Sequence, residues 1–319
     1  MGGEPSAVMS GEFDRIARYF APLAAAPSLG LTDDAACLRP TPGRDQIITV
    51  DQMLESVHFL PADPPDLIAR KLLRRNLSDL AAMGATPLHY LLTTALRADT
   101  PEPWLAQFAQ GLAADQAHYQ ITLIGGDSTS TPGPLAFSIT MIGTIEPGSA
   151  LRRNGAQPGD AIFVTGTIGD AALGLAVARG DYPDPTGFLR TRRLLPEPRL
   201  NQPIHSLVHA AIDVSDGLLQ DLMHLCTQSN LAAAIHARAV PTSPAAAACG
   251  PEALMRRLTG GDDYELILAA PPSAETALRQ ACAPTPITRI GHFAPGAPGL
   301  TLLDDPPLSL PDHFGWTHF

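Results

Sequence analysis

Apolar residues along the first half of the chain recur with two different spacings. Three stretches place an apolar side chain every three or four positions, and each is expected to form an amphipathic helix. They are residues 12–23, 66–83 and 103–118. Short β-branched and aliphatic runs lie between them and predict strands at residues 47–50, 89–96, 120–124 and 135–145. The first of these strands is expected to deliver Asp51 at its carboxyl end.

The turn-forming segment 146–149 is the best domain boundary in the sequence, because a similar order of elements restarts after it. The second half predicts strands at 161–165, 210–214 and 264–269, helices at 170–179 and 218–228, and a Pro-rich surface segment at 181–203. Strands and helices thus alternate in both halves. This pattern predicts two α/β or α+β domains, residues 1–147 and 148–319.

Composition and charge narrow the class of protein. The chain has 319 residues, of which 45% are hydrophobic and 17% charged, values that argue against a disordered chain or a coiled coil. Its formal charge of −11, without a stripe of Lys or Arg, argues against nucleic acid as a partner. No apolar run reaches the ~18 residues of a membrane helix, and the N-terminus shows no leader pattern. We therefore expect a cytoplasmic protein without membrane contact.

The few cysteines and lysines exclude several kinds of site. The four cysteines are far apart in sequence, which argues against a disulfide framework or a zinc knuckle. Lys71 is the only lysine, and no G-x-x-x-x-G-K-[ST] pattern surrounds it, which excludes a Walker-type nucleotide site. No Gly-rich loop precedes Lys71 and no H-R-D or D-F-G follows it, which argues against a protein-kinase site.

The main candidates for functional residues are aspartates at the ends of predicted strands and helices or on apolar faces. Asp79 lies within an apolar helix, where an unpaired carboxylate would cost several kcal/mol, on the order of buried-ion penalties. Several converging carboxylates need more positive charge than the one lysine and the neighbouring Arg74 and Arg75 supply, and hard oxygen ligands favour Mg²⁺. For Asp213 and Asp216, a helix N-cap role is the structural alternative. The set comprises Asp33, Asp34, Asp51, Asp79, Asp127, Asp213, Asp216, Asp262 and Asp263.

Magnesium held by aspartates usually completes its shell with substrate phosphates, and glycine-rich turns fit that chemistry. Gly125-Gly126-Asp127 is expected to form a turn with bare backbone amides, and Ser215-Asp216-Gly217 to add a hydroxyl and free amides at a helix start. Arg152 and Arg153 follow the boundary, where a guanidinium can clamp a phosphate. The alternatives are ordinary tight turns and a solvated arginine pair.

Two aromatic rings complete the candidate list. His58 follows Asp51 by a few residues and offers a hydrogen-bonding ring, with a structural histidine as the alternative. Trp316 can stack on a planar ligand or simply dock the C-terminal tail.

Taken together, these segments resemble the thiamine-monophosphate kinase family, within the superfamily typified by aminoimidazole ribonucleotide synthetase. The resemblance extends from Gly11 to Trp316. Its specific motifs are Asp-Asp-Ala-Ala at 33–36, Asp51 with His58-Phe59, the Asn-Leu-Ser-Asp stretch at 76–85, Ile-Gly-Gly-Asp at 124–127, the Gly-to-Asp turn at 155–160, Asp-Val-Ser-Asp-Gly-Leu at 213–218, and Gly-Gly-Asp-Asp-Tyr-Glu-Leu at 260–266.

The resemblance implies that ATP donates its terminal phosphoryl group to thiamine monophosphate, giving thiamine diphosphate and ADP. It implies two mixed-sheet domains, and a homodimer in which the N-terminal domains join their sheets into a barrel-like assembly. It implies contacts to several Mg²⁺ ions from Asp34, Thr49, Asp51, Asp79, Asp127, Asp213 and Asp216. ATP would be held by Gly126, Asp127, Arg153 and Ser215, and the thiamine portion by His58, Asp262 and Trp316. Asp79, Asp127 and Arg153 would serve the transfer itself.

The chain departs from the family pattern at three positions. Thr32 and Val50 replace the usual glycine and threonine, and Asp262 replaces a glutamate that is one methylene longer. The carboxylate of Asp262 therefore has a shorter reach toward the thiamine portion than the usual glutamate. Three other functions remain open: another ATP-using enzyme of the superfamily, a non-catalytic ATP- and metal-binding regulator, or a metal-dependent phosphatase. The lack of a second lysine argues against the first.

Overall fold

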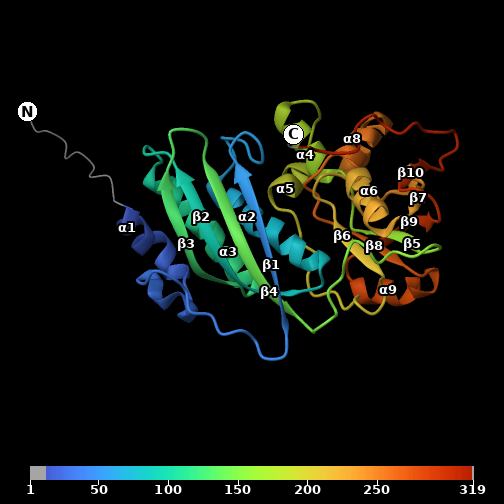
Figure 1. Cartoon of the computed structure of the whole chain (residues 1–319). Helices are drawn as coiled ribbons and strands as arrows, with labels where there is room; N and C mark the ends of the chain where they lie inside the picture. Colours follow the sequence, from blue (N-terminus) through green and yellow to red (C-terminus); the bar gives the residue numbers. More distant parts are fainter. Residues whose placement is uncertain (1–11, 318–319) are drawn as a thin grey trace, which may run out of the picture. The chain divides into compact units, whose positions relative to one another are not determined.

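Two β-sheets organise the chain (Figure 1). The computed structural model describes residues 12–317. Backbone contacts divide the chain into two compact units, each assembled from separate stretches of sequence. The first unit comprises residues up to Pro40, Val50–Leu73 and Leu88–Ile142, and the second Thr41–Thr49, Arg74–Pro87 and the chain from Gly143 onward.

The first sheet has four strands in the order β1-β4-β2-β3. They are β1 (Asp45–Leu54), β2 (Thr86–Leu96), β3 (Thr122–Ser130) and β4 (Ala136–Ile145). Strands β2 and β3 run parallel, with Thr93 opposite Asp127. β1 and β3 form the two ends of this order, so each has a sheet neighbour on one side.

Two long helices accompany this sheet, α2 (Pro65–Ala82) and α3 (Glu102–Tyr119). Helix α3 packs on the sheet through aromatic side chains: the rings of Phe108 and Phe137 stack with centroids 4.7 Å apart, and Trp104 stacks on Phe137 at 5.9 Å. An ion pair of 2.8 Å between Arg70 and Asp115 joins α2 to α3. The predicted helices at 66–83 and 103–118 are thus confirmed.

The N-terminal segment before the sheet is helical in short pieces. The structure has α1 (Glu12–Arg15), a π-helical turn (Ile16–Phe20) and two 3₁₀ turns (Ala21–Leu23 and Ala26–Leu31). The single helix predicted at 12–23 is therefore helical throughout but changes type.

The second sheet has six strands in the order β10-β7-β9-β5-β8-β6. All its neighbours are antiparallel except β10 and β7, so the sheet is mixed, as the resemblance implied. The strands are β5 (Ala161–Thr165), β6 (Ala210–Asp213), β7 (Ala232–Ile235), β8 (Leu266–Ala270), β9 (Ile287–Ala294) and β10 (Gly299–Leu302). The accompanying helices are α4 (Asp170–Arg179), α5 (Phe188–Leu194), α6 (Leu218–Ser229), α7 (Pro244–Ala247), α8 (Leu254–Thr259) and α9 (Glu275–Cys282), with short 3₁₀ turns at Ala237–Ala239, Pro251–Ala253 and Pro272–Ala274.

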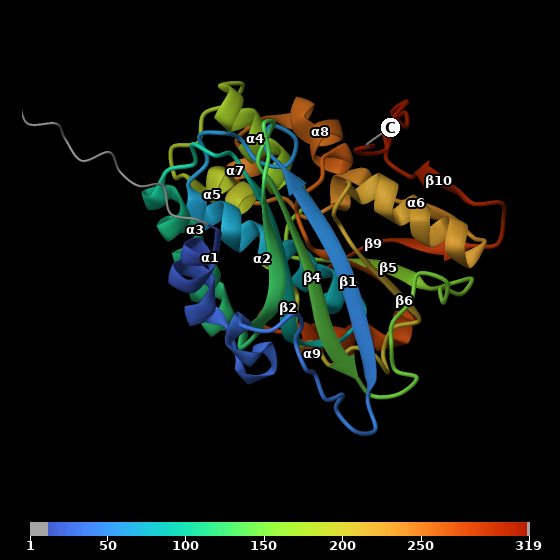
Figure 2. The same cartoon turned by 60° about the vertical axis from the view of Figure 1, so that its left-hand side comes forward.

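Helices cover both faces of this sheet (Figure 2). In β5, Ile162 and Val164 belong to the apolar cluster that contains the α6 leucines. Phe163, between them, belongs to the cluster that contains Leu278 of α9. Because successive side chains of a strand point to opposite faces, all five residues of β5 are buried.

The structure corrects several local predictions. β1 continues past Val50, so Asp51 lies inside the strand and not at its end. β3 runs through Gly125-Gly126-Asp127, so this segment is strand and not a turn. The Pro-rich segment 181–203 contains helix α5. The sequence pattern missed β7, β9 and β10; β7 is only four residues long and mostly alanine, so it carries no alternation to detect.

The prediction of reduced cysteines is confirmed. All four cysteines are free thiols, and burial raises the pKa of Cys226 and Cys282 to about 11. Among residues 12–317, no helix has the length and apolar character to cross a membrane. The boundary at 147/148 and the barrel-like pairing of N-terminal sheets remain predictions.

Candidate active site

The carboxyl end of β6 places Asp213 against helix α2. The Asp213 side chain is buried, and its Oδ2 accepts a 2.7 Å hydrogen bond from the Ser78 hydroxyl. Ser78 itself is fully buried on α2. Residues from two separate motifs are therefore in direct contact.

A second contact joins two predicted metal ligands. The Thr49 hydroxyl of β1 donates a 2.6 Å hydrogen bond to Oδ2 of Asp79. Asp79 is half-buried on α2, one residue beyond Ser78. With its proton directed at Asp79, the Thr49 oxygen keeps lone pairs that can face a cation.

The Asp221 side chain accepts hydrogen bonds from the backbone of the loop between β6 and α6. Its Oδ2 accepts backbone hydrogen bonds of 3.0 Å from Ser215 and 3.1 Å from both Asp216 and Gly217. The expectation that these amides are free for a phosphate is therefore wrong, because Asp221 in the first turn of α6 already accepts all three. The Ser215 hydroxyl remains the predicted ligand of this loop.

Negative charge accumulates around this loop. Burial, and then the neighbouring carboxylates of Asp213 and Asp216, raise the pKa of Asp221 well above its usual range. Atoms of Asp216, Asp221 and His224 that can ligate a metal ion lie within 4.8 Å of one another. The sequence interpretation missed Asp221 and His224, although their three-residue spacing on a predicted helix was a usable signal.

A second loop, Gly260 to Tyr264, lies beside Ser215 and Asp216. The Asp262 amide donates a 2.9 Å hydrogen bond to the Ser215 carbonyl. A Cβ atom on Gly261 would lie 2.2 Å from the same carbonyl oxygen, so only glycine permits this approach. The Tyr264 hydroxyl donates a 2.9 Å hydrogen bond to Oδ1 of Asp262.

The C-terminal segment docks on the same region. The Trp316 amide donates a 3.0 Å hydrogen bond to the Asp216 carbonyl, and Gln220 donates to the Trp316 carbonyl at 2.7 Å. Trp316 is 52% exposed. Ser215, Asp216, Asp262 and Trp316, which the sequence predicted as ligands from three separate motifs, thus form one cluster.

Other predicted ligands lie on the first sheet. Gly126 and Asp127 are exposed residues of β3, opposite Leu92 and Thr93 of β2. A Cβ on Gly126 would lie 1.8 Å from the Leu92 carbonyl oxygen, so strand packing by itself requires glycine at this position. Asp51 lies within β1, where its carbonyl accepts a 3.0 Å hydrogen bond from Ser138.

The turn after β1 fixes His58. Its Nδ1 accepts a 3.1 Å hydrogen bond from the Leu54 amide, and its carbonyl accepts one of 3.1 Å from Lys71. The neutral ring therefore carries its proton on Nε2, which can donate to a ligand. The single lysine is buried and serves this turn.

Asp34 and Arg153 are exposed predicted ligands on loops. Asp34 follows the 3₁₀ turn that ends at Leu31. Arg153 lies between β4 and β5 in sequence, and its carbonyl accepts a 2.9 Å hydrogen bond from the Ser229 hydroxyl. Their roles remain predictions.

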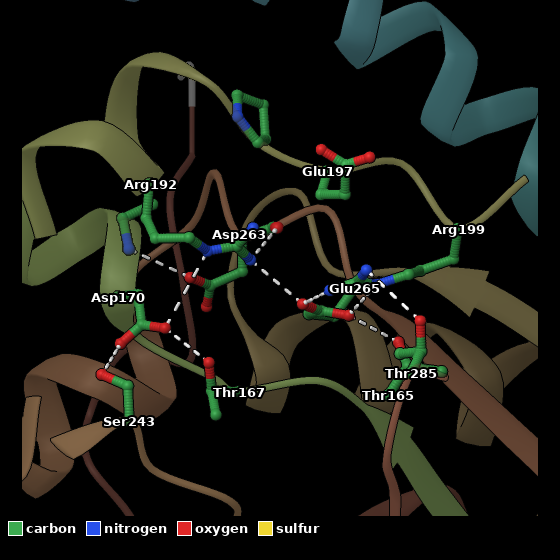
Figure 3. A network of polar contacts seen from close by, with 12 residues as sticks. Thr165, Thr167, Asp170, Arg192, Glu197, Arg199, Ser243, Asp263, Glu265 and Thr285 are labelled. Atoms are coloured by element: carbon green, nitrogen blue, oxygen red, sulfur yellow. Dashed lines mark hydrogen bonds and ion pairs between the residues drawn. The ribbon is translucent and has the colours of Figure 1, made fainter. Parts of the chain in front are cut away.

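A network of ionic and polar contacts is formed by residues that adjoin the 260–264 loop in sequence, among them Glu265 (Figure 3). Glu265 is fully buried and accepts from Arg192 at 3.0 Å, from Arg199 Nε at 2.6 Å and from Thr165 at 2.7 Å. Arg192 belongs to α5 and Arg199 follows it, so this carboxylate ties the Pro-rich segment to the start of β8. The sequence interpretation did not assign these residues a role.

Comparison with known proteins decides the family. The profile described as "AIR synthase related protein, N-terminal domain" matches residues 32–145, and the corresponding C-terminal profile matches residues 157–300. The thiamine-monophosphate kinase of Caulobacter vibrioides is 40% identical, covering 98% of this chain and 92% of the relative. That of Escherichia coli is 40% identical over 97% and 98% of the two chains. The chain belongs to the thiamine-monophosphate kinase family.

Solved structures of the family share this fold. The crystal structure of thiamine-monophosphate kinase from Stenotrophomonas maltophilia is 39% identical with a TM-score of 0.78, covering 85% of this chain and 89% of that one. A structure described as AaThiL complexed with AMPPCP and TMP is 27% identical with a TM-score of 0.76, covering 98% of this chain and all of the other. A HypE structure, described as a hydrogenase maturation protein in complex with ATP, shares the fold at 20% identity, with a TM-score of 0.73 and coverage of 88% and 85%.

Proposed function

We propose that this chain transfers the terminal phosphoryl group of ATP to thiamine monophosphate, giving thiamine diphosphate and ADP. The observation that carries the proposal is full-length similarity, at 40% identity, to proteins named thiamine-monophosphate kinase. A structural relative at 27% identity is described as complexed with AMPPCP, an ATP analogue, and TMP. The contacts that join Ser215, Asp216, Asp262 and Trp316 support a substrate site on these loops.

The donor set fits magnesium. Carboxylates and a hydroxyl are the hard oxygen ligands that Mg²⁺ prefers. Thr49 lies in contact with Asp79, and the charges of Asp213 and Asp216 are close enough to raise the pKa of Asp221. When bound, magnesium neutralises phosphate charge. We assign its ligands to Asp34, Thr49, Asp51, Asp79, Asp127, Asp213 and Asp216.

The remaining assignments follow the chemistry of each substrate. Gly126, Asp127, Arg153 and the Ser215 hydroxyl hold ATP, with the Arg153 guanidinium offsetting repulsion between two anions. The thiamine portion carries a cationic thiazolium ring, which suits the Asp262 carboxylate and the exposed Trp316 face. His58 donates from Nε2 to the same portion.

The proposed reaction requires no general base from the protein. The second pKa of a phosphate monoester is near ~6, so the acceptor is mostly deprotonated at neutral pH and needs no general base. Catalysis then rests on holding the two anions in line while positive charge offsets their repulsion. Asp79, Asp127 and Arg153 are the residues we place at this step.

We also propose a homodimer built on the first domain, residues 1–147, with residues 148–319 completing the site. Strand β1 ends its sheet and exposes alternate apolar side chains, with Ile48 60% and Val50 64% exposed. An exposed apolar strand at a sheet end is a surface that a second copy can cover. The use of ATP agrees with the predicted cytoplasmic location.

The test is ADP release by the purified full-length chain with ATP, magnesium and thiamine monophosphate. We expect ADP and thiamine diphosphate in equal amounts. Release of inorganic phosphate from thiamine monophosphate without ATP would indicate a phosphatase, and binding of ATP without turnover a regulator. Turnover with a different acceptor only, in a panel of phosphorylated and carboxylated metabolites, would indicate another enzyme of the superfamily.

A further inference from the structure

The loop that carries Asp262 has unusual backbone geometry. Asp262 has φ of 71° and Tyr264 has φ of 53°, both in the left-handed region that residues with a side chain rarely adopt. Such conformations persist only where surrounding contacts enforce them, and they concentrate at functional sites. Two of them flank a single residue, Asp263.

Contacts on both sides enforce this geometry. The Asp263 side chain accepts backbone hydrogen bonds of 2.5 Å from Gly169 and 3.1 Å from Ala171. Main-chain hydrogen bonds of 2.9 Å join the Asp262 amide to Ser215 and the Tyr264 amide to Val214. The backbone of residues 262–264 is therefore held independently of the Tyr264 hydroxyl.

The Tyr264 ring is buried, with 1% of the residue exposed, and its hydroxyl donates to Oδ1 of Asp262 at 2.9 Å. A hydrogen bond to one oxygen favours the ionised carboxylate and restricts its rotation. We propose that Tyr264 is a positioning residue that fixes the Asp262 carboxylate for the cationic thiazolium ring. This inference rests on the proposed function, in which Asp262 contacts the thiamine portion.

The length of the side chain makes such positioning important. Aspartate is one methylene shorter than the glutamate usual at this position in the family. If its carboxylate rotates away from the thiazolium ring, the shorter side chain cannot extend to restore the contact. Tyr264 keeps the shorter carboxylate in one orientation. Because the thiazolium ring is remote from the transferred phosphoryl group, the contact affects substrate binding and leaves the chemical step unchanged.

The experiment is steady-state kinetics of Tyr264→Phe, which removes only the hydroxyl. We expect the KM for thiamine monophosphate to rise about tenfold, with kcat and the KM for ATP each within about twofold of wild type. Tyr90→Phe is the matched control, because Tyr90 is also buried and donates at 3.1 Å to Gln116 on α3. It is expected to leave all three constants unchanged. An unchanged KM for thiamine monophosphate in Tyr264→Phe overturns the inference.

A double-mutant cycle separates positioning from a merely structural role. Asp262→Asn alone is expected to raise the KM for thiamine monophosphate, and adding Tyr264→Phe to it is expected to change nothing further. A second tenfold increase in the double variant would show that Tyr264 acts without Asp262 and overturns the inference. Absence of wild-type turnover with thiamine monophosphate removes the proposed function and this inference together.

A measurement on the wild-type chain covers the case in which Tyr264→Phe does not fold. The sequence has five tyrosines, so ¹³Cζ-tyrosine labelling gives few resonances, and replacing each of the other four assigns Tyr264. We expect thiamine monophosphate to shift the Tyr264 resonance and an ATP analogue alone to leave it in place. A Tyr264 resonance that thiamine monophosphate does not move overturns the inference.

Discussion

The Ser78 hydroxyl and the Asp213 carboxylate lie 2.7 Å apart in a hydrogen bond that joins helix α2 to the end of strand β6. Both side chains are buried. Both belong to motifs that carry the family resemblance, at 76–85 and 213–218. Ser78 therefore supports a predicted metal ligand, and its neighbour Asp79 is itself one.

We expect Ser78→Ala to lower the free energy of unfolding by about 1–3 kcal/mol, because a buried carboxylate loses a hydrogen-bond donor. Urea denaturation measures the change. Ser138→Ala is a suitable comparison, since its hydroxyl donates to a backbone carbonyl at a half-buried position, and a smaller loss is expected there. Equal losses in the two variants would show that the Asp213 contact has no special weight.

Neutralising Asp79 or Asp127 tests the assigned metal ligands. Asp79→Asn and Asp127→Asn each keep the shape of the side chain while removing its charge, and we expect either to reduce kcat by at least about 100-fold at saturating magnesium. Circular dichroism and thermal unfolding check that the fold is retained. Glu275→Gln, at a half-buried position of α9 where the carboxylate pairs with Arg279, is the charge-matched control and is expected to keep full activity. Full activity in either aspartate variant would remove that residue from the site.

The elements that the sequence predicted well are those with a strong periodic signal. Helices α2 and α3 match their predicted ranges to within one residue at each end, because apolar side chains recur at helical spacing along both. The short strand β7 was missed because its burial depends on neighbouring strands, not on its own pattern. Gly125 to Asp127 was taken for a turn because glycine favours turns, whereas here the close packing of β3 on β2 requires it.

The sequence likewise predicted some residues of the candidate site and missed others. Asp213, Asp216, Asp262 and Trp316 were found from residue type and motif, and the structure brings Asp216, Asp262 and Trp316 to one pair of loops. Asp221 was missed because its role, accepting three backbone amides of the loop before α6, is visible only when the loop is folded. The sequence alone does not specify which residues that are distant along the chain come into contact.

Glu265 is expected to be the most sensitive carboxylate for stability. Glu265 is fully buried between Arg192 and Arg199, whose side chains are only 13% and 14% exposed, so Glu265→Gln leaves two mostly buried guanidinium groups facing a neutral amide. Breaking a buried ion pair in this way costs about 3–5 kcal/mol, measured by urea denaturation. Glu146→Gln is the control: its ion pair with Arg44 is at the surface, with the Glu146 side chain 67% exposed, and a loss below about 1 kcal/mol is expected. Similar losses would contradict the assignment.

Asp263 gives the stability a defined pH dependence. Burial outweighs two backbone hydrogen bonds and raises the pKa of Asp263 from 3.8 to about 8. Between these values the folded chain binds more protons at this site than the unfolded chain does, so this contribution to stability is complete below pH 4 and is lost as the pH rises toward 8. We expect the free energy of unfolding to fall more between pH 5 and pH 8 in wild type than in Asp263→Asn. Urea denaturation at both pH values measures the difference, and parallel pH profiles would contradict it.

The exposed apolar face of β1 tests the proposed homodimer. Val50 is 64% exposed at the end of its sheet, and a lysine there would place a charge in the interface on both copies of the chain. We therefore expect Val50→Lys to shift the chain from dimer to monomer in sedimentation velocity at micromolar concentration. Leu303→Lys is the matched control, since Leu303 is an exposed apolar residue after β10, with 40% of the residue accessible, and it is expected to leave the dimer intact. A wild-type chain that sediments as a monomer, or a Val50→Lys variant that stays dimeric, would show that this face of β1 does not form the interface.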